Sequence, residues 1–233
     1  MNKTKKVAVN YFTDVLCIWA YIAQVRVNEL KSEFSNQLDF DYHFFPVFGD
    51  VFSKMQSRKD GIEGYSKHVH DVCLQFDHIK IHPELWKKNI PTTSLSIHTF
   101  LKALQILEDK EILSKSPQDQ YKNNTIFEEF LWCVRTSFFE QAVDISQTSE
   151  LFKIAQNLEI NTEEVSNVLN SGEATAKMYR DMQLKEKFKI PGSPSYVLNS
   201  GRQILYGNIG YRLIKSNICE LLETPHKDYA SWC

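Results

Sequence analysis

The chain has 233 residues, of which 42% are hydrophobic and 24% are charged, and its formal net charge is −2. This composition is ordinary for a soluble globular protein, and the near-zero charge argues against a nucleic-acid partner, whose phosphates require a basic surplus or stripe. No stretch is long enough to cross a membrane, and the apolar run at residues 7–12 is too short for a signal-peptide core. We therefore expect a cytoplasmic protein that binds neither nucleic acid nor membrane.

The first 48 residues have the pattern of a β-α-β unit. Residues 7–12 form a short run rich in β-branched and aromatic side chains, which favours a strand. From Ile18 the apolar side chains recur at spacings of three to five residues, which predicts a helix. Residues 38–44 alternate between apolar and polar side chains, the period of a strand with one solvated face. A helical crossover implies that the two strands are parallel.

The rest of the chain is predicted to be helical until strands return near its end. The expected helices span residues 92–112, 125–143, 151–158, 163–169 and about 173–188. Residues 195–198 and 203–206 flank a turn and predict a hairpin. Residues 211–222 predict a closing helix.

A cysteine stands where the first strand gives way to the first helix, in the segment DVLCIWAY at residues 14–21. Only a thiolate attacks a disulfide, and the free amides and dipole of a helix N-terminus favour an anion. We therefore predict that Cys17 is a redox nucleophile whose pKa lies below the ordinary value of about 8.5. Trp19 would half-cover it. Because Ala20 stands where the second cysteine of a Cys-x-x-Cys pair would stand, the turn offers one thiol.

A second motif, GSPSYV at residues 192–197, opens the strand at 195–198. Beside a redox cysteine, a cis peptide bond between Ser193 and Pro194 is favoured. It would expose the backbone N–H and C=O of Ser193 for pairing with an extended substrate opposite Cys17. The alternative is a trans proline that simply begins a strand.

The order β-α-β, helices, β-β-α resembles a thioredoxin-like fold of the α/β class split by a large all-helical insertion. We expect a thioredoxin-like domain at residues 1–49 and 190–233 and a helical insertion domain at 50–189. In this arrangement the insertion would lie over the thiol and select substrates.

Together these features resemble the DsbA-family thioredoxin-like proteins, the group that holds FrnE-type thiol-disulfide oxidoreductases, 2-hydroxychromene-2-carboxylate isomerases and kappa-class glutathione transferases. The matching segments are DVLCIWAYI at residues 14–22, FF at 138–139, NSGE at 170–173 and GSPSYV at 192–197. FrnE-type enzymes usually carry Cys-Pro-Trp-Cys-Tyr at the active-site turn. This chain keeps Cys17, Trp19 and Tyr21 but has Ile18 and Ala20.

The resemblance implies a thiol-disulfide oxidoreductase that acts through Cys17 alone, with Trp19, Ser193 and Pro194 binding substrate. A mixed disulfide at Cys17 must then be resolved by an outside thiol, so glutathione is the expected co-substrate and no cofactor is expected to be bound. Protein or small-molecule disulfides would be the substrates. Cys233, in the polar tail, is the alternative resolving cysteine, with Cys73 behind it. Related proteins are often dimeric, which leaves a homodimer open.

Two other interpretations stay open. The isomerases and transferases of the group carry serine where Cys17 stands, so the chain could be a glutathione-dependent isomerase or transferase. A degenerate binding module, which would hold peptides at Pro194 without thiol chemistry, is the non-enzymatic alternative.

The remaining cysteines and histidines predict neither a disulfide framework nor a metal site. Five scattered cysteines, an odd number, do not predict disulfide bonds. Cys133 and Cys219 lie in apolar helical patterns and are interpreted as buried hydrophobic residues. Metal ligands could be drawn from the histidine-rich stretch at residues 68–82, but its spacing matches no zinc pattern, so we predict a solvated surface and no metal.

Overall fold

The computed structural model describes residues 6–223. Contact clustering divides the chain into two compact units, one within Met1–Phe45 and Asp181–Cys233 and the other within Pro46–Arg180. The second boundary falls inside a continuous helix, α8 (Glu173–Lys187), whereas the sequence predicts it at residues 189/190, where the helical pattern ends. Among the described residues, no helix is long and apolar enough to span a membrane.

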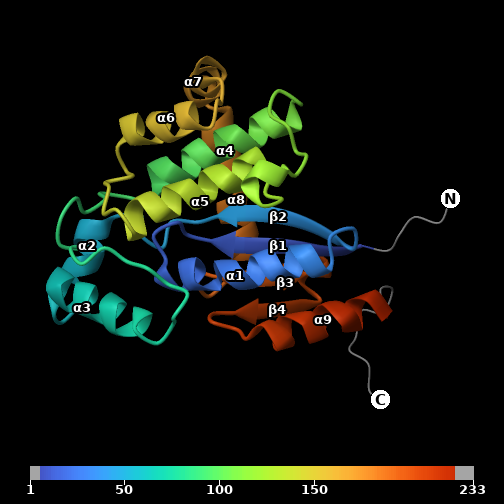
Figure 1. The fold of residues 1–233 in the computed structure, drawn as a ribbon, viewed down its shortest axis with the longest axis horizontal. Helices are drawn as coiled ribbons and strands as arrows, with labels where there is room; N and C mark the ends of the chain where they lie inside the picture. The colour runs from blue at the N-terminus through green and yellow to red at the C-terminus, as the bar shows by residue number, and fades with distance from the viewer. Residues whose placement is uncertain (1–5, 224–233) are drawn as a thin grey trace. The chain divides into compact units, whose positions relative to one another are not determined.

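The first unit is built on a four-stranded sheet in the order β2-β1-β3-β4 (Figure 1). Its strands are β1 (Val7–Thr13), β2 (Leu38–Phe44), β3 (Ser195–Leu198) and β4 (Gln203–Tyr206). β1 pairs with β2 in parallel and with β3 antiparallel, and β3 and β4 form the predicted antiparallel hairpin. Strands from both ends of the chain therefore meet at the centre of one sheet.

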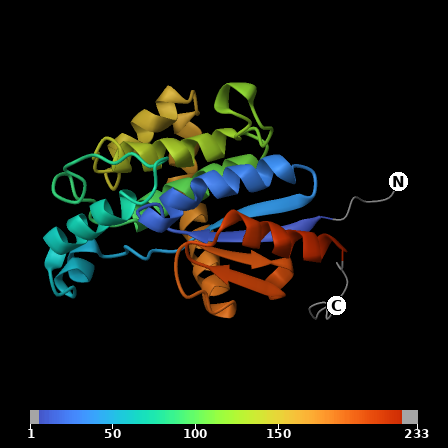
Figure 2. The ribbon, with the colours of Figure 1, turned by 60° about the horizontal axis from the view of Figure 1, so that its bottom comes forward.

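Helices cover both faces of this sheet. α1 (Ile18–Glu33) and α9 (Tyr211–Glu223) lie on one face, and the part of α8 from Asp181 onward lies on the other (Figure 2). In β2, Asp39 and Asp41 are exposed as the alternation predicts. His43 is buried, although the alternation predicts that it shares the solvated face with Asp39 and Asp41, because Asp181 of α8 lies against its ring.

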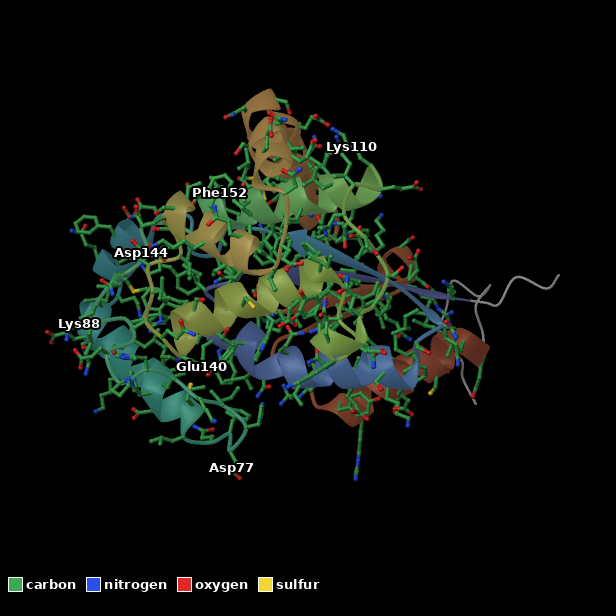
Figure 3. All side chains as sticks on the ribbon, turned by 45° about the horizontal axis from the view of Figure 1, so that its top comes forward. Asp77, Lys88, Lys110, Glu140, Asp144 and Phe152 are labelled. Atoms are coloured by element: carbon green, nitrogen blue, oxygen red, sulfur yellow. The ribbon has the colours of Figure 1, made fainter. Side chains whose placement is uncertain are left out.

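The regular secondary structure of the second unit is helical, apart from an isolated bridge between Gln118 and Asn124, and loops join its helices within the described residues. Its helices are α2 (Val51–Gln56), α3 (Gly61–Cys73), α4 (Leu95–Asp109), α5 (Ile126–Phe139), α6 (Thr148–Asn157) and α7 (Thr162–Ser171), and the beginning of α8 belongs to it. α4 and α5 pack through parallel rings of Phe100 and Phe130, 5.2 Å apart. Lys110, which is labelled at the end of α4 in Figure 3, forms an ion pair with Glu173 at the start of α8.

Candidate active site

Cys17 occupies the N-cap position of α1, at the end of the turn that follows β1. The turn is shaped by buried Asp14, whose carboxylate accepts the N–H of Leu16 at 2.8 Å and whose carbonyl accepts the N–H of Cys17 at 3.1 Å. The carbonyl of Cys17 in turn accepts the N–H of Tyr21, which begins the helix. The thiol is therefore held at the point where the first helical amides remain unpaired within the helix.

The two motifs singled out in the sequence come together here. The Sγ atom of Cys17 donates to the carbonyl oxygen of Ser193 at 3.2 Å. The side-chain oxygen of Ser193 accepts the N–H of Asp14 at 3.0 Å. The peptide bond between Ser193 and Pro194 is cis. Segments some 176 residues apart in sequence thus form one small site.

The loop that carries Ser193 is fixed by its neighbours on β3 and β4. The hydroxyl of Ser195 donates to the carbonyl of Gly192 at 2.7 Å, and the N–H of Gly207 donates to the carbonyl of Pro194 at 2.9 Å. A Cβ atom at Gly192 would lie 2.7 Å from the hydroxyl oxygen of Tyr206. The close approach of this ring explains the glycine. Sequence reasoning missed Tyr206, whose only signal is its register opposite Ser195.

The pKa of Cys17 differs from the sequence-based prediction. Burial raises the pKa of the thiol above its ordinary value, because the thiolate would lose its hydration. Hydrogen bonds from the Ser193 side chain and from the backbone amides of Ala20 and Trp19 lower the pKa, and the Asp14 carboxylate raises it. The helix N-terminus acts in the predicted direction, but desolvation outweighs it. The prediction of a lowered pKa is therefore wrong.

The other predicted site residues are distributed unevenly. Ile18 and Ala20 are buried in the first turn of α1, and Trp19 is partly exposed between them. Cys73 belongs to the helical unit, where burial raises its pKa to about 11. Cys233 lies outside the described residues. A resolving role for either cysteine stays a prediction.

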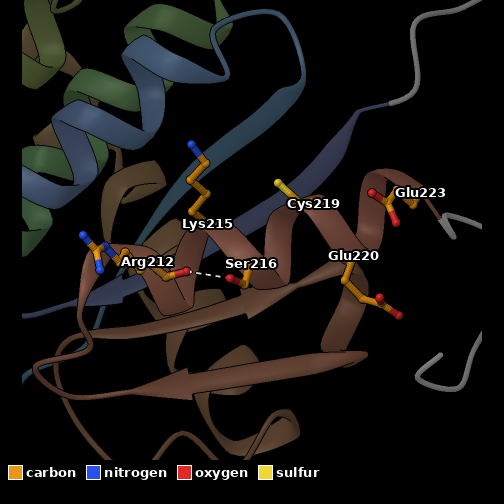
Figure 4. Close-up of a pocket in the computed structure, with 6 residues that line it drawn as sticks. All are labelled: Arg212, Lys215, Ser216, Cys219, Glu220 and Glu223. Atoms are coloured by element: carbon orange, nitrogen blue, oxygen red, sulfur yellow. Dashed lines mark hydrogen bonds between the residues drawn. The ribbon is translucent and has the colours of Figure 1, made fainter. Parts of the chain in front are cut away.

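Cys133 and Cys219 differ from their interpretation as buried residues, because each is partly exposed. Cys219 lies in a hollow on α9 together with Arg212, Lys215, Ser216, Glu220 and Glu223 (Figure 4). Lys215 is already paired with Glu33 of α1. Within residues 6–223, no three His, Cys, Asp or Glu side chains are grouped so as to hold a metal ion.

A buried acid on α8 supports the strand beside the site. One carboxylate oxygen of Asp181 accepts the Nδ1–H of His43 at 2.8 Å, and the other accepts the backbone N–H of Phe44 at 2.7 Å. The Nε2 atom of His43 lies 2.9 Å from the side-chain oxygen of Asn10, and its ring stacks on Phe12. Phe44 pairs with the last residue of β1, directly before the turn that carries Cys17. Sequence reasoning missed this pair, since nothing in a helical pattern marks one aspartate among many.

The family model of the DSBA-like thioredoxin domain matches residues 8–218 of the chain. The chain belongs to this family. Membership of the DSBA-like thioredoxin family makes it a relative of DsbA-like thiol-disulfide oxidoreductases, as its motifs suggested. No curated protein sequence matches the chain.

Solved structures with the same fold cover nearly the whole chain. A candidate protein disulfide isomerase from Nitrosomonas europaea has a TM-score of 0.73 and 16% identity, over 96% of this chain and 100% of that one. The cytosolic disulfide reductase DsbM from Pseudomonas aeruginosa has a TM-score of 0.65 and 15% identity, over 92% and 99%. A 2-hydroxychromene-2-carboxylate isomerase has a TM-score of 0.60 and 14% identity, over 94% and 98%. These likenesses confirm the predicted thioredoxin-like α/β fold with its helical insertion.

The raised pKa of this DSBA-like thiol predicts a shifted pH profile. Alkylation of Cys17 by iodoacetamide is expected to have its midpoint above the ordinary thiol value of about 8.5. At neutral pH it should be slower than alkylation of the partly exposed Cys219, an internal reference followed by mass spectrometry. Because the folded pKa is raised, the thiol's contribution to stability is present below the unfolded pKa and is lost as the pH rises through the folded value.

A matched variant tests the cause of that profile. Ser193→Ala removes a side chain that lowers the pKa of the Cys17 thiol and keeps the backbone carbonyl that accepts from Sγ, so the midpoint should move further upward. A midpoint below about 8.5 in the unaltered protein would mean that the amides at the helix start outweigh desolvation.

Proposed function

We propose that this protein is a monothiol disulfide reductase that uses Cys17 as its nucleophile and glutathione as its electron donor. The observation that carries the proposal is the placement of the Cys17 sulfur 3.2 Å from the Ser193 carbonyl oxygen. Beside that thiol, position 20 is a buried alanine, so the turn holds no second sulfur. In this assignment Trp19 flanks the entrance, and Ser193 and Pro194 bind the substrate.

The proposed reaction has two exchange steps. The Cys17 thiolate attacks the glutathione sulfur of a mixed disulfide, so that a disulfide bond forms to Cys17 while the substrate leaves as a thiolate and takes a proton. The thiolate of a second glutathione then attacks the sulfur bound to Cys17, releasing glutathione disulfide and regenerating the Cys17 thiolate. In sum, a glutathionylated thiol and one glutathione give a free thiol and glutathione disulfide.

The direction of this reaction is argued from the pKa of Cys17. DsbA is a strong oxidant because its reduced form is stabilised. Here burial opposes the thiolate, so the reduced form lacks part of that stabilisation and reduction of the substrate is favoured. A fold shared with a cytosolic disulfide reductase, of which a structure with glutathione exists, agrees with this direction and with a cytoplasmic location.

A glutathione-dependent isomerase or transferase is the second candidate. It is favoured by the same raised pKa, because a protonated Cys17 donates a hydrogen bond as a serine hydroxyl would. In that case Cys17 would donate to the glutathione sulfur without forming a bond to it. The fold shared with 2-hydroxychromene-2-carboxylate isomerase supports this alternative.

The monothiol mechanism is tested by restoring the missing cysteine. With glutathione disulfide, the unaltered protein is expected to accumulate a Cys17–glutathione mixed disulfide that persists until glutathione is added. The Ala20→Cys variant should convert the adduct to a disulfide between residues 17 and 20 and release glutathione. Intact-mass and peptide mass spectrometry distinguish the two products.

Two controls complete the experiment. Ala20→Ser matches the added size without the sulfur and should retain the mixed disulfide. Cys233→Ser tests the tail cysteine as a resolving thiol. Failure of the unaltered protein to form any adduct at Cys17 would contradict the proposal, and an internal disulfide that is lost in Cys233→Ser would replace glutathione with Cys233 as the resolving thiol.

A further inference from the structure

The outer edge of β4 has no neighbouring strand among the described residues, because β4 is the last strand of the sheet (Figure 1). Such an edge presents N–H and C=O groups that can pair with a strand of another chain. Two apolar side chains of this strand are well exposed, Ile204 at 42% and Tyr206 at 51%. Residues two apart lie on one face of a strand, so these side chains form an exposed apolar pair beside the open edge.

The hydrogen-bond register determines which backbone groups of β4 point outward. The N–H of Gly207 donates to the carbonyl of Pro194 at 2.9 Å, and Tyr206 stands opposite Ser195 in the next pair along the hairpin. In an antiparallel ladder, pairs that exchange hydrogen bonds alternate with pairs that do not. The N–H and C=O groups of Ile204 and Tyr206 therefore point away from β3, and within the described chain no hydrogen bond reaches them.

This edge is complementary to itself. A two-fold axis that passes through Leu205, perpendicular to the sheet, places Ile204 of one copy opposite Tyr206 of the other in an antiparallel pair. Because both residues direct their backbone groups outward, each such pair is of the kind that exchanges both N–H···O bonds. The isoleucine and tyrosine side chains then meet on the same face, and a pair of an aromatic and a β-branched side chain stabilises a sheet.

The charges on the two edges of the sheet favour a second copy of the chain as the partner of β4. Residues 203–208 include no charged side chain, so pairing of two copies there brings no like charges together. At the opposite edge, β2 has the exposed carboxylates of Asp39 and Asp41. Charged side chains on an edge strand oppose pairing with another copy. The β2 edge is therefore protected by charge, whereas the β4 edge is not.

We propose that the outer edge of β4 is the interface of a homodimer, in which the sheets of two copies join across a two-fold axis at Leu205. The proposal assigns a surface to the homodimer that the sequence left open. All the paired residues belong to the first unit. The interface does not depend on the reaction proposed for Cys17.

The test is the mass of the full chain in solution, measured by sedimentation equilibrium under reducing conditions over a range of concentrations. Twice the chain mass of 27.2 kDa is expected as the concentration rises. Ile204→Glu combined with Tyr206→Glu places like charges directly opposite each other and should return the mass to that of one chain. Ile204→Lys combined with Tyr206→Glu places opposite charges there and should keep the dimer.

Two further variants serve as controls, and circular dichroism shows whether every variant is folded. Val25→Glu adds a charge at an exposed apolar position of α1 and should remain dimeric. Cys17→Ser should also dimerise, which separates this interface from the thiol reaction. A monomer at all concentrations, a dimer that survives the double glutamate change, or a folded lysine–glutamate variant that is monomeric would overturn the proposal.

Discussion

Replacing Cys17 with serine is expected to reduce the release of glutathione from a glutathionylated protein to the background rate of glutathione alone. Serine keeps the size and the hydrogen bond to the Ser193 carbonyl, but its hydroxyl cannot form the mixed disulfide on which both exchange steps depend. The rate is measured as the formation of glutathione disulfide, in a coupled assay that reduces this disulfide as it forms.

The same variant separates the two candidate functions. Cys219→Ser, which alters a partly exposed thiol on α9, is the matched control and should retain full activity. Conjugation or isomerisation with glutathione should survive in Cys17→Ser, because a hydroxyl can still donate to the glutathione sulfur. Reductase activity that persists in this variant would contradict the proposed nucleophile.

Replacing Asp181 with alanine should lower the free energy of unfolding by about 2–6 kcal/mol, because it leaves two buried donors without an acceptor and each such donor costs about 1–3 kcal/mol. Asp181 is 3% exposed, and its carboxylate serves both His43 and the backbone N–H of Phe44. The variant leaves both donors without this acceptor. Denaturant unfolding followed by circular dichroism measures the loss.

Asp41 is the control for this effect. Its carboxylate lies 3.4 Å from Nε2 of His43, but its side chain is 63% exposed. Asp41→Ala should therefore change the free energy of unfolding by no more than about 1 kcal/mol, as solvent-exposed pairs do. Equal losses in the two variants would mean that burial of Asp181 does not determine its contribution. Because Phe44 pairs with the residue before the active-site turn, the Asp181 variant should also show faster alkylation of Cys17 as the turn loosens.

Much of the architecture could be predicted from local patterns. The alternation at residues 38–44 and the apolar spacing after Ile18 predicted β2 and α1 close to their observed bounds, because periodicity reflects which face an element buries. The hairpin of β3 and β4 followed from two short strand patterns around a turn. The position of Cys17 at a strand-to-helix turn, and its pairing with the distant Ser193–Pro194 motif, also followed from the sequence through the family resemblance.

The tertiary structure determined the burial and the long-range hydrogen bonds of those residues. Sequence placed Cys17 at a helix start, where an anion is favoured, but only the packed structure shows that burial outweighs the amides and raises the pKa. The approach of Tyr206 to Gly192 and the pair of Asp181 with His43 join residues that no local pattern relates. Periodicity reports the face that a segment buries, whereas desolvation and long-range hydrogen bonds depend on which atoms the other segments bring to that face.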